Sequence, residues 1–258
     1  MASRNPIRTV TVLRTHLLTP NMKRITVSGS ELRGFPEHQE SGYVKLIFAN
    51  YSAETASDRQ DKSQKPLMRT YTIRRHDPEA LEMDIDFVVH GDNGPASAWA
   101  MQAQVGDSLT LTGPGGKKVV EMSADWFFIA GDMTALPAIS INLQQMPKDA
   151  RGYAVIEIID KADRQQLQAP EGIELHWVIN PHPDIPNKHL SNAVKALPWQ
   201  AGKVNVWVAA EFDTMRDLRR YFKQEMAVAR SDIYASSYWK IGETDEGNKL
   251  AKRNDAEA

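Results

Sequence analysis

Short runs of alternating hydrophobic and polar residues fill the chain up to about residue 112. The runs are rich in β-branched and aromatic residues and are separated by turn residues, which is the pattern of β-strands. The expected strands are residues 8–17, 22–28, 43–48, 67–74, 81–89 and 108–112. Closely spaced strands with one intervening helix favour a β-barrel. The polar stretch 52–65 is expected to be a solvated loop between two of these strands.

The pattern changes after residue 121, where apolar strands alternate with helices. The expected strands are residues 126–130, 153–159, 174–180 and 204–210, and the expected helices are 135–145, 189–196 and 214–227. This alternation predicts a parallel sheet covered by helices. We therefore expect a two-domain β + α/β protein, with an antiparallel β-barrel over 1–120 and a parallel-sheet α/β domain over 121–243. The charged segment 244–258 is expected to be a solvated tail, with a frayed helix as the alternative.

Composition narrows the class of protein. A chain of 258 residues with 41% hydrophobic and 25% charged residues is ordinary for a soluble globular protein. The net charge of -2 argues against nucleic-acid binding through global positive charge. There is no cysteine, which excludes disulfides, thiolate nucleophiles and thiolate-bound iron–sulfur clusters, so electron transfer would need an organic cofactor. Neither a secretory signal nor a membrane span is recognised, so a cytoplasmic protein is expected.

Two segments predict a site for a dinucleotide. Residues 69–74 read RTYTIR, and strand alternation places Arg69 and Tyr71 on one face, so that a phosphate-pairing guanidinium lies beside an aromatic ring. Further along, Gly94 and Pro95 suit the start of a helix, whose N–H groups and positive dipole end attract a pyrophosphate. Alone, RTYTIR is more commonly a strand with a surface arginine and a core tyrosine, but the glycine–proline helix start that follows makes this alternative improbable.

The order and spacing of these segments resemble the siderophore-interacting protein family of FAD-containing ferric-siderophore reductases, relatives of the ferredoxin-reductase superfamily. The resemblance rests on residues 69–74 (RTYTIR), 86–91 (DFVVHG), 94–100 (GPASAWA), 113–116 (GPGG), 131–137 (GDMTALP) and 238–243 (YWKIGE). It covers nearly the whole chain. It implies that the barrel binds FAD and that the α/β domain, of the NAD(P)H-binding type, receives electrons.

The resemblance also implies roles for individual residues. Arg69 would pair with the FAD pyrophosphate, Tyr71 would pack against the isoalloxazine, and Thr72 would hydrogen-bond near its reactive nitrogen edge. The other implied cofactor-binding positions are Asp86, Val88 and His90 on the next strand, Gly94, Ala96 and Ser97 at the helix start, and Thr134 and Ala135 in the second domain. A structural histidine is the alternative for His90, and Trp99 is expected to be core packing. No metal site is expected, because the seven histidines form no ligand signature.

Substrate binding is expected to depend on local positive charge, because ferric complexes of catecholate or hydroxycarboxylate siderophores can be anionic. By resemblance, Lys45 and Lys240 match basic positions of the family, and Lys117 is a further candidate. An ordinary surface lysine is the alternative for each. Lysine rather than arginine at 240 would bind as a point charge, without bidentate geometry.

The electron donor is less defined. The loop 131–137 lacks the glycine-dense phosphate fingerprint of a dinucleotide fold, and Asp132 at a helix start competes with a bound phosphate. Phe212 could narrow the approach of a nicotinamide. NAD(P)H binding is therefore expected to be weak, and a ferredoxin-like donor is the alternative. Arg216, Arg219 and Arg220 share one helix and could receive an acidic protein or a nucleotide phosphate, or could form a solvated helix face.

The hypothesis is a cytoplasmic, monomeric ferric-siderophore reductase in which FAD performs the electron chemistry, so that no catalytic side chain is required. Its partners would be a ferric siderophore and an electron donor, with neither nucleic acid nor membrane. Two rivals stay open. One is a general flavin reductase or electron-supply flavoprotein, and the other is a non-catalytic siderophore-binding flavoprotein. The siderophore class is left open.

Overall fold

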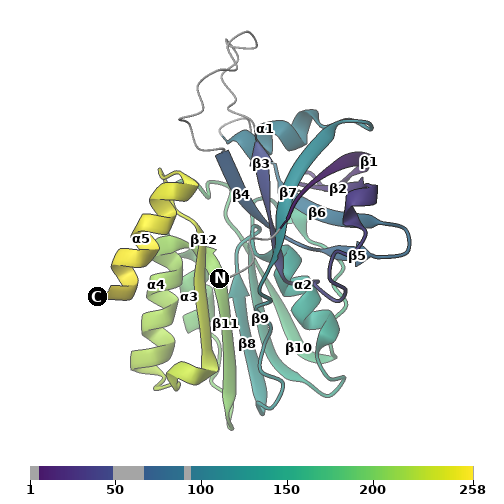
Figure 1. Cartoon of the computed structure of the whole chain (residues 1–258). Helices are drawn as coiled ribbons and strands as arrows, with labels where there is room; N and C mark the ends of the chain where they lie inside the picture. Colours follow the sequence, from purple (N-terminus) through teal and green to yellow (C-terminus); the bar gives the residue numbers. More distant parts are fainter. Residues whose placement is uncertain (1–5, 49–66, 90–93, 258) are drawn as a thin grey trace. The chain divides into compact units, whose positions relative to one another are not determined.

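The computed structural model describes residues 6–48, 67–89 and 94–257. The chain divides into two compact units, Met1–Lys117 and Lys118–Ala258 (Figure 1). The predicted loop 52–65 and the candidate residue His90 lie outside the described residues.

Unit 1 contains a seven-stranded antiparallel sheet. The strands are β1 (Ile7–Thr19), β2 (Met22–Ser28), β3 (Tyr43–Phe48), β4 (Leu67–Thr72), β5 (Arg75–Asp77), β6 (Glu82–Val88) and β7 (Ser108–Gly115). Their order in the sheet is β4-β3-β7-β1-β2-β6-β5. A short helical turn, η1 (Ser30–Leu32), follows β2, and helix α1 (Pro95–Gln102) lies between β6 and β7 in the chain.

The core of unit 1 explains why this sheet curls. Alternate residues along the strands point to one side, and those of β1, β2, β3, β6 and β7 join a single buried cluster that also contains Ala96 and Ala100 of α1. Since side chains of strands from across the sheet converge on one core, the sheet wraps around it, as expected for a barrel.

One predicted strand is divided in two. The expected strand 67–74 ends at Thr72, and a separate strand, β5, starts at Arg75. The backbone changes partner between them, because Ile73 N–H donates to the Gly42 carbonyl at 2.9 Å, whereas Arg74 N–H donates to the Asp84 carbonyl at 3.0 Å. The two ends of the sheet, β4 and β5, are therefore consecutive in the chain and meet at this corner.

Unit 2 contains a five-stranded parallel sheet in the order β10-β9-β8-β11-β12. The strands are β8 (Trp126–Gly131), β9 (Arg151–Ile158), β10 (Gly172–Ile179), β11 (Val204–Glu211) and β12 (Ile233–Trp239). The helices are α2 (Leu136–Gln145), α3 (His189–Lys195), α4 (Phe212–Arg220) and α5 (Asp245–Glu257), with short turns η2 (Lys161–Asp163), η3 (Tyr221–Glu225) and η4 (Arg230–Asp232). The predicted combination of an antiparallel β unit and a parallel α/β unit is confirmed.

The strand order places helices on both faces of the parallel sheet. The chain runs outward from β8 through β9 to β10 and then returns to β11 and β12 on the other side of β8. Right-handed crossovers therefore place α2 on one face and α3 and α4 on the other (Figure 1). Helices α3 and α4 pack on the buried residues of β8, β9 and β11.

Two elements after residue 230 differ from the prediction: strand β12 was not predicted, and the segment 244–258 forms the helix that was only the alternative to a solvated tail. The edge strand β12 lacks a long apolar run, since Ala235, Ser236 and Ser237 interrupt it, and it forms by pairing with β11. The segment expected to be a solvated tail contains α5, which is anchored to β12 by the Ser237 Oγ to Asn248 Oδ1 hydrogen bond of 2.9 Å. No described helix is long and apolar enough to cross a membrane.

Candidate functional site

The RTYTIR strand has the alternation that the sequence predicts. In β4, Arg69 pairs with Leu46 and Tyr71 with Val44, so both side chains lie on the core-facing side of the sheet. The Tyr71 ring packs on Phe87 of β6, with ring centroids 4.4 Å apart and planes at 37°. Burial raises the pKa of the Tyr71 phenol, which keeps it neutral. Packing of Tyr71 against an isoalloxazine stays a prediction.

Helix α1 is connected to this strand by an aromatic contact of Trp99. Phe87 lies 5.7 Å from Trp99 of α1 between ring centroids, so Phe87 joins Tyr71 to the helix. Gly94 is the N-cap with extended backbone, and Pro95 occupies the first turn. Intrahelical bonding starts with Ala98 N–H, which donates to the Gly94 carbonyl at 2.9 Å. The N–H of Ala96 precedes this bond and belongs to the part of a helix that binds anions.

The opposite face of the same strands carries a different set of residues. Thr72 pairs with Tyr43 of β3, and Lys45 pairs with Thr70 of β4 and with Thr112 of β7. Because the flanking residues of β3 point into the core, Tyr43, Lys45 and Thr72 share the outer face. Lysine 117 ends the unit, and its Cγ lies 3.7 Å from the ideal Cβ position at Gly42. Lys45 and Thr72 therefore lie on the outer face of the sheet, whereas Arg69 and Tyr71 lie on the core-facing side.

Asp86 already has a protein partner. Arg24 of β2 lies directly across from it and donates from Nε at 2.6 Å and from Nη2 at 2.8 Å to its two carboxylate oxygens. The Asp86 side chain is only 4% exposed. Val88 is half-buried at the end of the strand. The role of Asp86 and Val88 in flavin binding stays a prediction, and the carboxylate of Asp86 is fixed by Arg24.

Two arginines beside Asp86 were not selected from the sequence. Arg24 would have been found only from the antiparallel register of β2 and β6, which a sequence pattern does not define. Burial lowers the pKa of the Arg74 guanidinium, and the nearby charge of Arg24 lowers it further. A third guanidinium, Arg75, donates to Asp84 at 2.9 Å. The outer side of β6 is therefore a network of paired charges.

In unit 2, the residues at the topological switch point are Asp132, after β8, and Glu211, at the end of β11. Strand order reverses between β8 and β11, and ligands of open α/β sheets bind at such a point. Asp132 is buried and accepts hydrogen bonds from Thr134 N–H (2.9 Å), Thr134 Oγ1 (2.5 Å), Glu211 N–H (2.8 Å) and Trp239 Nε1 (2.8 Å). Burial raises the pKa of Asp132, and these hydrogen bonds oppose the rise.

Glu211 is the N-cap residue of the next helix, α4. Its carboxylate accepts from the N–H groups of Asp213 at 2.7 Å and Thr214 at 3.1 Å, which caps α4, and from Ile241 N–H at 3.3 Å. Thr134 and Ala135, the predicted cofactor contacts of this unit, lie in the turn that Asp132 holds, and Ala135 is fully buried. Carboxylates therefore occupy the positions at which a dinucleotide fold presents free N–H groups to phosphate.

The other candidate residues of unit 2 are held by side-chain partners. Lys240 Nζ lies 3.4 Å from Asp213 Oδ2 and 4.6 Å from the centroid of the Phe212 ring. Phe212 itself is 5% exposed and belongs to the core. The Lys240 side chain is 24% exposed, so it can still be reached from solvent.

Three arginines of α4, considered for docking a donor, are paired with carboxylates. Arg219 binds Asp255 of α5 through two hydrogen bonds of 2.7 and 2.8 Å, and Arg216 binds the same carboxylate at 2.9 Å. Arg220 binds Asp217 at 2.8 Å. The pairs of Arg216 and Arg219 attach α5 to α4, and the pair of Arg220 lies within α4. The three arginines are therefore used within unit 2, which favours the interpretation as a charged helix face.

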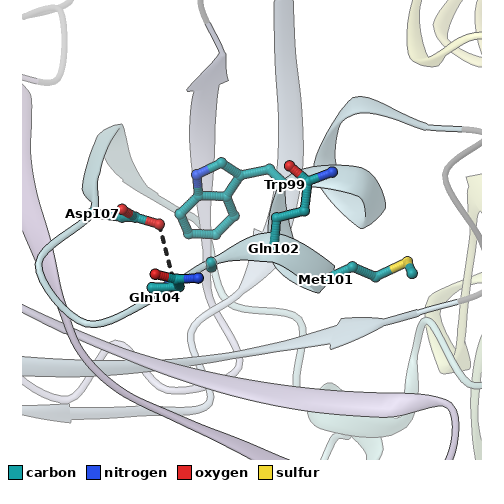
Figure 2. A pocket seen from close by; sticks show the side chains of 6 residues that line it. Trp99, Met101, Gln102, Gln104 and Asp107 are labelled. Carbon is teal, nitrogen blue, oxygen red and sulfur yellow. Dashed lines mark hydrogen bonds between the residues drawn. The ribbon is translucent and has the colours of Figure 1, made fainter.

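An open pocket of about 620 Å³ lies at the other end of α1 from the predicted phosphate site. Figure 2 shows its lining residues, among them Trp99, Gln102 and Asp107, and the hydrogen bond between Gln104 N–H and Asp107 Oδ2, 2.8 Å long. The lining residues include a carboxylate and two carboxamides but no cationic side chain. The lining side chains therefore supply no cation to pair with a pyrophosphate. Trp99 packs on the core, as expected, and also forms one wall of the pocket.

Comparison with protein families matches both units. Residues 11–118 match the siderophore-interacting FAD-binding domain, and residues 124–242 match the siderophore-interacting protein domain. Together these matches span most of the chain.

Individual proteins of known name and structure agree with these matches. The chain is 36% identical to the ferric vibriobactin reductase ViuB of Vibrio cholerae, over 93% of this chain and 91% of the relative. It is 29% identical to the NADPH-dependent ferric-chelate reductase of Escherichia coli, over 90% of this chain and 92% of the relative. The crystal structure of the siderophore-interacting protein SipS from Aeromonas hydrophila superposes with a TM-score of 0.84 at 32% identity, covering 98% of this chain and 99% of that one.

Proposed function

The chain belongs to the siderophore-interacting protein family, and from this membership we propose that it is a FAD-dependent ferric-siderophore reductase. The observation that carries the proposal is the arrangement of unit 1. Phe87 contacts both Tyr71 of the arginine–tyrosine strand and Trp99 of the helix that starts at Pro95, and Lys45 lies on the strand paired with β4. The reaction would be the one-electron reduction of iron(III) in a siderophore, carried out by a monomer in the cytoplasm.

The residues of unit 1 fit a flavin dinucleotide. Arg69 supplies a planar guanidinium for the pyrophosphate, and the first turn of α1 supplies N–H groups with no acidic side chain in that turn. Gly94 has no Cβ, and among the described residues no atom lies within 4 Å of the position that one would occupy, which supports approach of a phosphate to the backbone there. When bound, FAD would supply the one-electron chemistry, so the chain would position the reactants and need neither a general base nor a nucleophile.

Lysines are proposed to bind the ferric chelate. Lys45 lies on the outer face of β3, beside the strand that carries Thr72, where a positive charge would attract an anionic ferric complex. Lys117 and Lys240 are the further candidates. Iron(II) is held less tightly than iron(III) by hard oxygen ligands, so reduction favours release. A tenfold change in the equilibrium corresponds to about 59 mV for one electron, so the tightest chelates would also need an iron(II) acceptor.

The electron donor is proposed to be NADPH or a ferredoxin-like protein. The Escherichia coli relative is named an NADPH-dependent enzyme, which supports the first. The carboxylates Asp132 and Glu211 at the switch point support weak binding of any nucleotide phosphate there. A ferredoxin-like donor is therefore kept as the alternative to NADPH. Measured NADPH oxidation by the flavin-loaded protein decides between them.

The test is a single-turnover experiment without air. Protein loaded with FAD is photoreduced and mixed with ferric catecholate, ferric citrate or ferric hydroxamate in the presence of an iron(II) chelator. We expect loss of the reduced-flavin spectrum to match the appearance of the iron(II) complex. Photoreduced free FAD at the same concentration is the control, and a protein no faster than this control with every chelate would contradict the proposal.

A further inference from the structure

Tyr43 is an aromatic side chain that the sheet leaves open to solvent. It starts β3, in which Val44, Leu46 and Phe48 are buried, but its own side chain points outward and the residue is 37% exposed. An exposed aromatic ring on the outer face of the sheet does not contribute to the core of unit 1. The residues around it on the outer face therefore determine what the ring can contact.

A glycine on the neighbouring strand fixes the position of the ring. Gly115 of β7 lies directly across from Tyr43. A Cβ atom built on Gly115 would lie 2.0 Å from Cζ of Tyr43 and 2.3 Å from both Cε atoms. Because Cζ is nearest and the two Cε atoms are equally distant, the face of the ring rests on the Gly115 backbone. Any other residue at 115 would push the ring away.

Two polar candidates share this face with the ring. Thr72 is the cross-strand neighbour of Tyr43 on β4, a relation that brings Cβ atoms within about 5 Å of each other. Lys45 follows two residues later on the same face of β3, about 7 Å along the strand. An aromatic surface, an ammonium group and a hydroxyl therefore lie within the span of one small chelate.

We propose that Tyr43 is a specificity-determining residue, whose ring on Gly115 binds the aryl group of a ferric catecholate siderophore beside the charge of Lys45. Catecholate ligands present flat aromatic rings that stack with a tyrosine, and their ferric complexes carry the negative charge that a lysine attracts. Hydroxamate and hydroxycarboxylate ligands lack the ring. The inference rests on the proposed function and names its substrate class.

Binding of three ferric complexes distinguishes the contribution of the Tyr43 ring from that of the Lys45 charge. Ferric 2,3-dihydroxybenzoate is anionic and aromatic, ferric citrate is anionic without a ring, and ferric acetohydroxamate is neutral without a ring. Their dissociation constants for the FAD-loaded protein are measured by fluorescence quenching, for the wild type, Tyr43→Ala, Tyr43→Leu and Lys45→Ala. Flavin absorbance of each variant reports whether it is folded and loaded.

We expect both Tyr43 variants to bind the aromatic complex about two- to tenfold more weakly, the size of an aromatic pair, and to leave ferric citrate unchanged. Lys45→Ala is expected to weaken both anionic complexes. Equal losses for the aromatic complex and citrate in Tyr43→Leu, or no loss for either, would overturn the inference.

Gly115→Ala tests the position of the ring without removing it. The added methyl must displace the ring, so we expect the same selective loss for the aromatic complex. Gly116→Ala is the matched control, since a Cβ there meets no atom within 4 Å. In a Tyr43→Ala background, Gly115→Ala should have no further effect, and an additional loss would show that Gly115 acts independently of the ring.

The outcomes also distinguish this inference from the proposed function. Iron(II) production by the wild type from every complex at the rate of free flavin would refute the reductase. Iron(II) production by the wild type, together with an unchanged preference for the aromatic complex in the Tyr43 and Gly115 variants, would refute only the role of Tyr43.

Discussion

The two units begin their helices in opposite ways. Helix α1 of unit 1 starts at Gly94, which has no side chain, and has no acidic residue in its first turn. Helix α4 of unit 2 starts at Glu211, whose carboxylate accepts from two N–H groups of the first turn, and Asp132 in turn accepts from the N–H of Glu211. The start of α1 thus has no side-chain cap, whereas the start of α4 is capped by a carboxylate of the protein itself.

This difference indicates which unit binds phosphate. A pyrophosphate at α1 would meet the positive partial charges of the helix start, and the first turn of the helix contains no acidic residue. At the switch point of unit 2 it would have to displace Glu211 from the first turn of α4 and approach the charge of Asp132. The strong phosphate site is therefore expected in unit 1 alone. The following changes test this contrast, from the largest expected effect to the smallest.

Asp132→Ala should have the largest effect, on the stability of unit 2. The substitution leaves buried donors of Thr134, Glu211 and Trp239 without their acceptor. We expect the free energy of unfolding of unit 2 to fall by about 2–4 kcal/mol. Denaturation followed by tryptophan fluorescence measures it, while flavin fluorescence follows unit 1.

Asp149→Ala, which removes an exposed carboxylate, is the control for that substitution. The structural role of Asp132 also predicts that its loss does not strengthen NADPH binding. Unchanged stability with tighter NADPH binding would mean that Asp132 acts mainly as a repulsive charge, and the contrast between the units would be wrong.

Arg69→Ala should weaken FAD binding more than any other substitution in unit 1. A guanidinium paired with a phosphate contributes charge-assisted hydrogen bonds, so we expect the dissociation constant of FAD to rise about 10- to 100-fold. Titration of the flavin-free protein with FAD measures it. Arg33→Ala, at an exposed position of the same unit, should leave FAD binding unchanged. Equal FAD dissociation constants of the two variants would show that Arg69 does not bind FAD.

Lys45→Ala and Lys240→Ala extend the contrast to substrate binding. Lys240 is already paired with Asp213, whereas no ion pair of Lys45 is recorded within the described residues. We expect Lys45→Ala to weaken binding of an anionic ferric chelate about three- to tenfold, and Lys240→Ala to weaken it less. Both variants should keep FAD. If Lys240→Ala weakened chelate binding more than Lys45→Ala, Lys240 of unit 2 would be the more important substrate-binding residue.

The smallest effect is expected at Asp255, a carboxylate of unit 2 used to attach α5. Its hydrogen bond with Arg219 is the main reason that its pKa is lowered. A carboxyl with a lowered folded-state pKa stabilises the fold above its unfolded pKa of about 4, and this contribution is lost as the pH falls through the folded-state pKa. Because Arg216 and Arg219 are partly exposed, we expect the ionised Asp255 carboxylate to contribute less than about 1 kcal/mol to the free energy of unfolding.

Hydrogen exchange of the α5 amides measures this contribution. Asp255→Asn should reduce the protection of α5 at pH 6, and the difference from the wild type should disappear at pH values below the folded-state pKa. Asp184→Asn, in an exposed loop, is the control. A difference that persists at low pH would show that the carboxylate charge does not hold α5.

Local patterns predicted most of the architecture. Residues 22–28 and 43–48 form β2 and β3 with the predicted bounds, and burial alternates along β3, because period two is a property of a single strand. The helix expected over 214–227 begins earlier, at Phe212, and ends in the π-turn η3. The edge strand β12 was missed because pairing with β11, rather than its own composition, makes it a strand.

The sequence by itself determined the class of this protein: strands followed by alternating strands and helices, the flavin-type motifs at Arg69 and Gly94, and the lysine in β3. Only the tertiary structure decided how the charged and aromatic residues are paired. Asp132 meets Glu211 and Trp239 across 79 and 107 residues of chain, and Arg24 meets Asp86 across 62. Periodicity is local and can be read along the chain, whereas these partners depend on sheet register and crossovers. The same holds for the Tyr43 ring on Gly115, which follows from the pairing of β3 with β7.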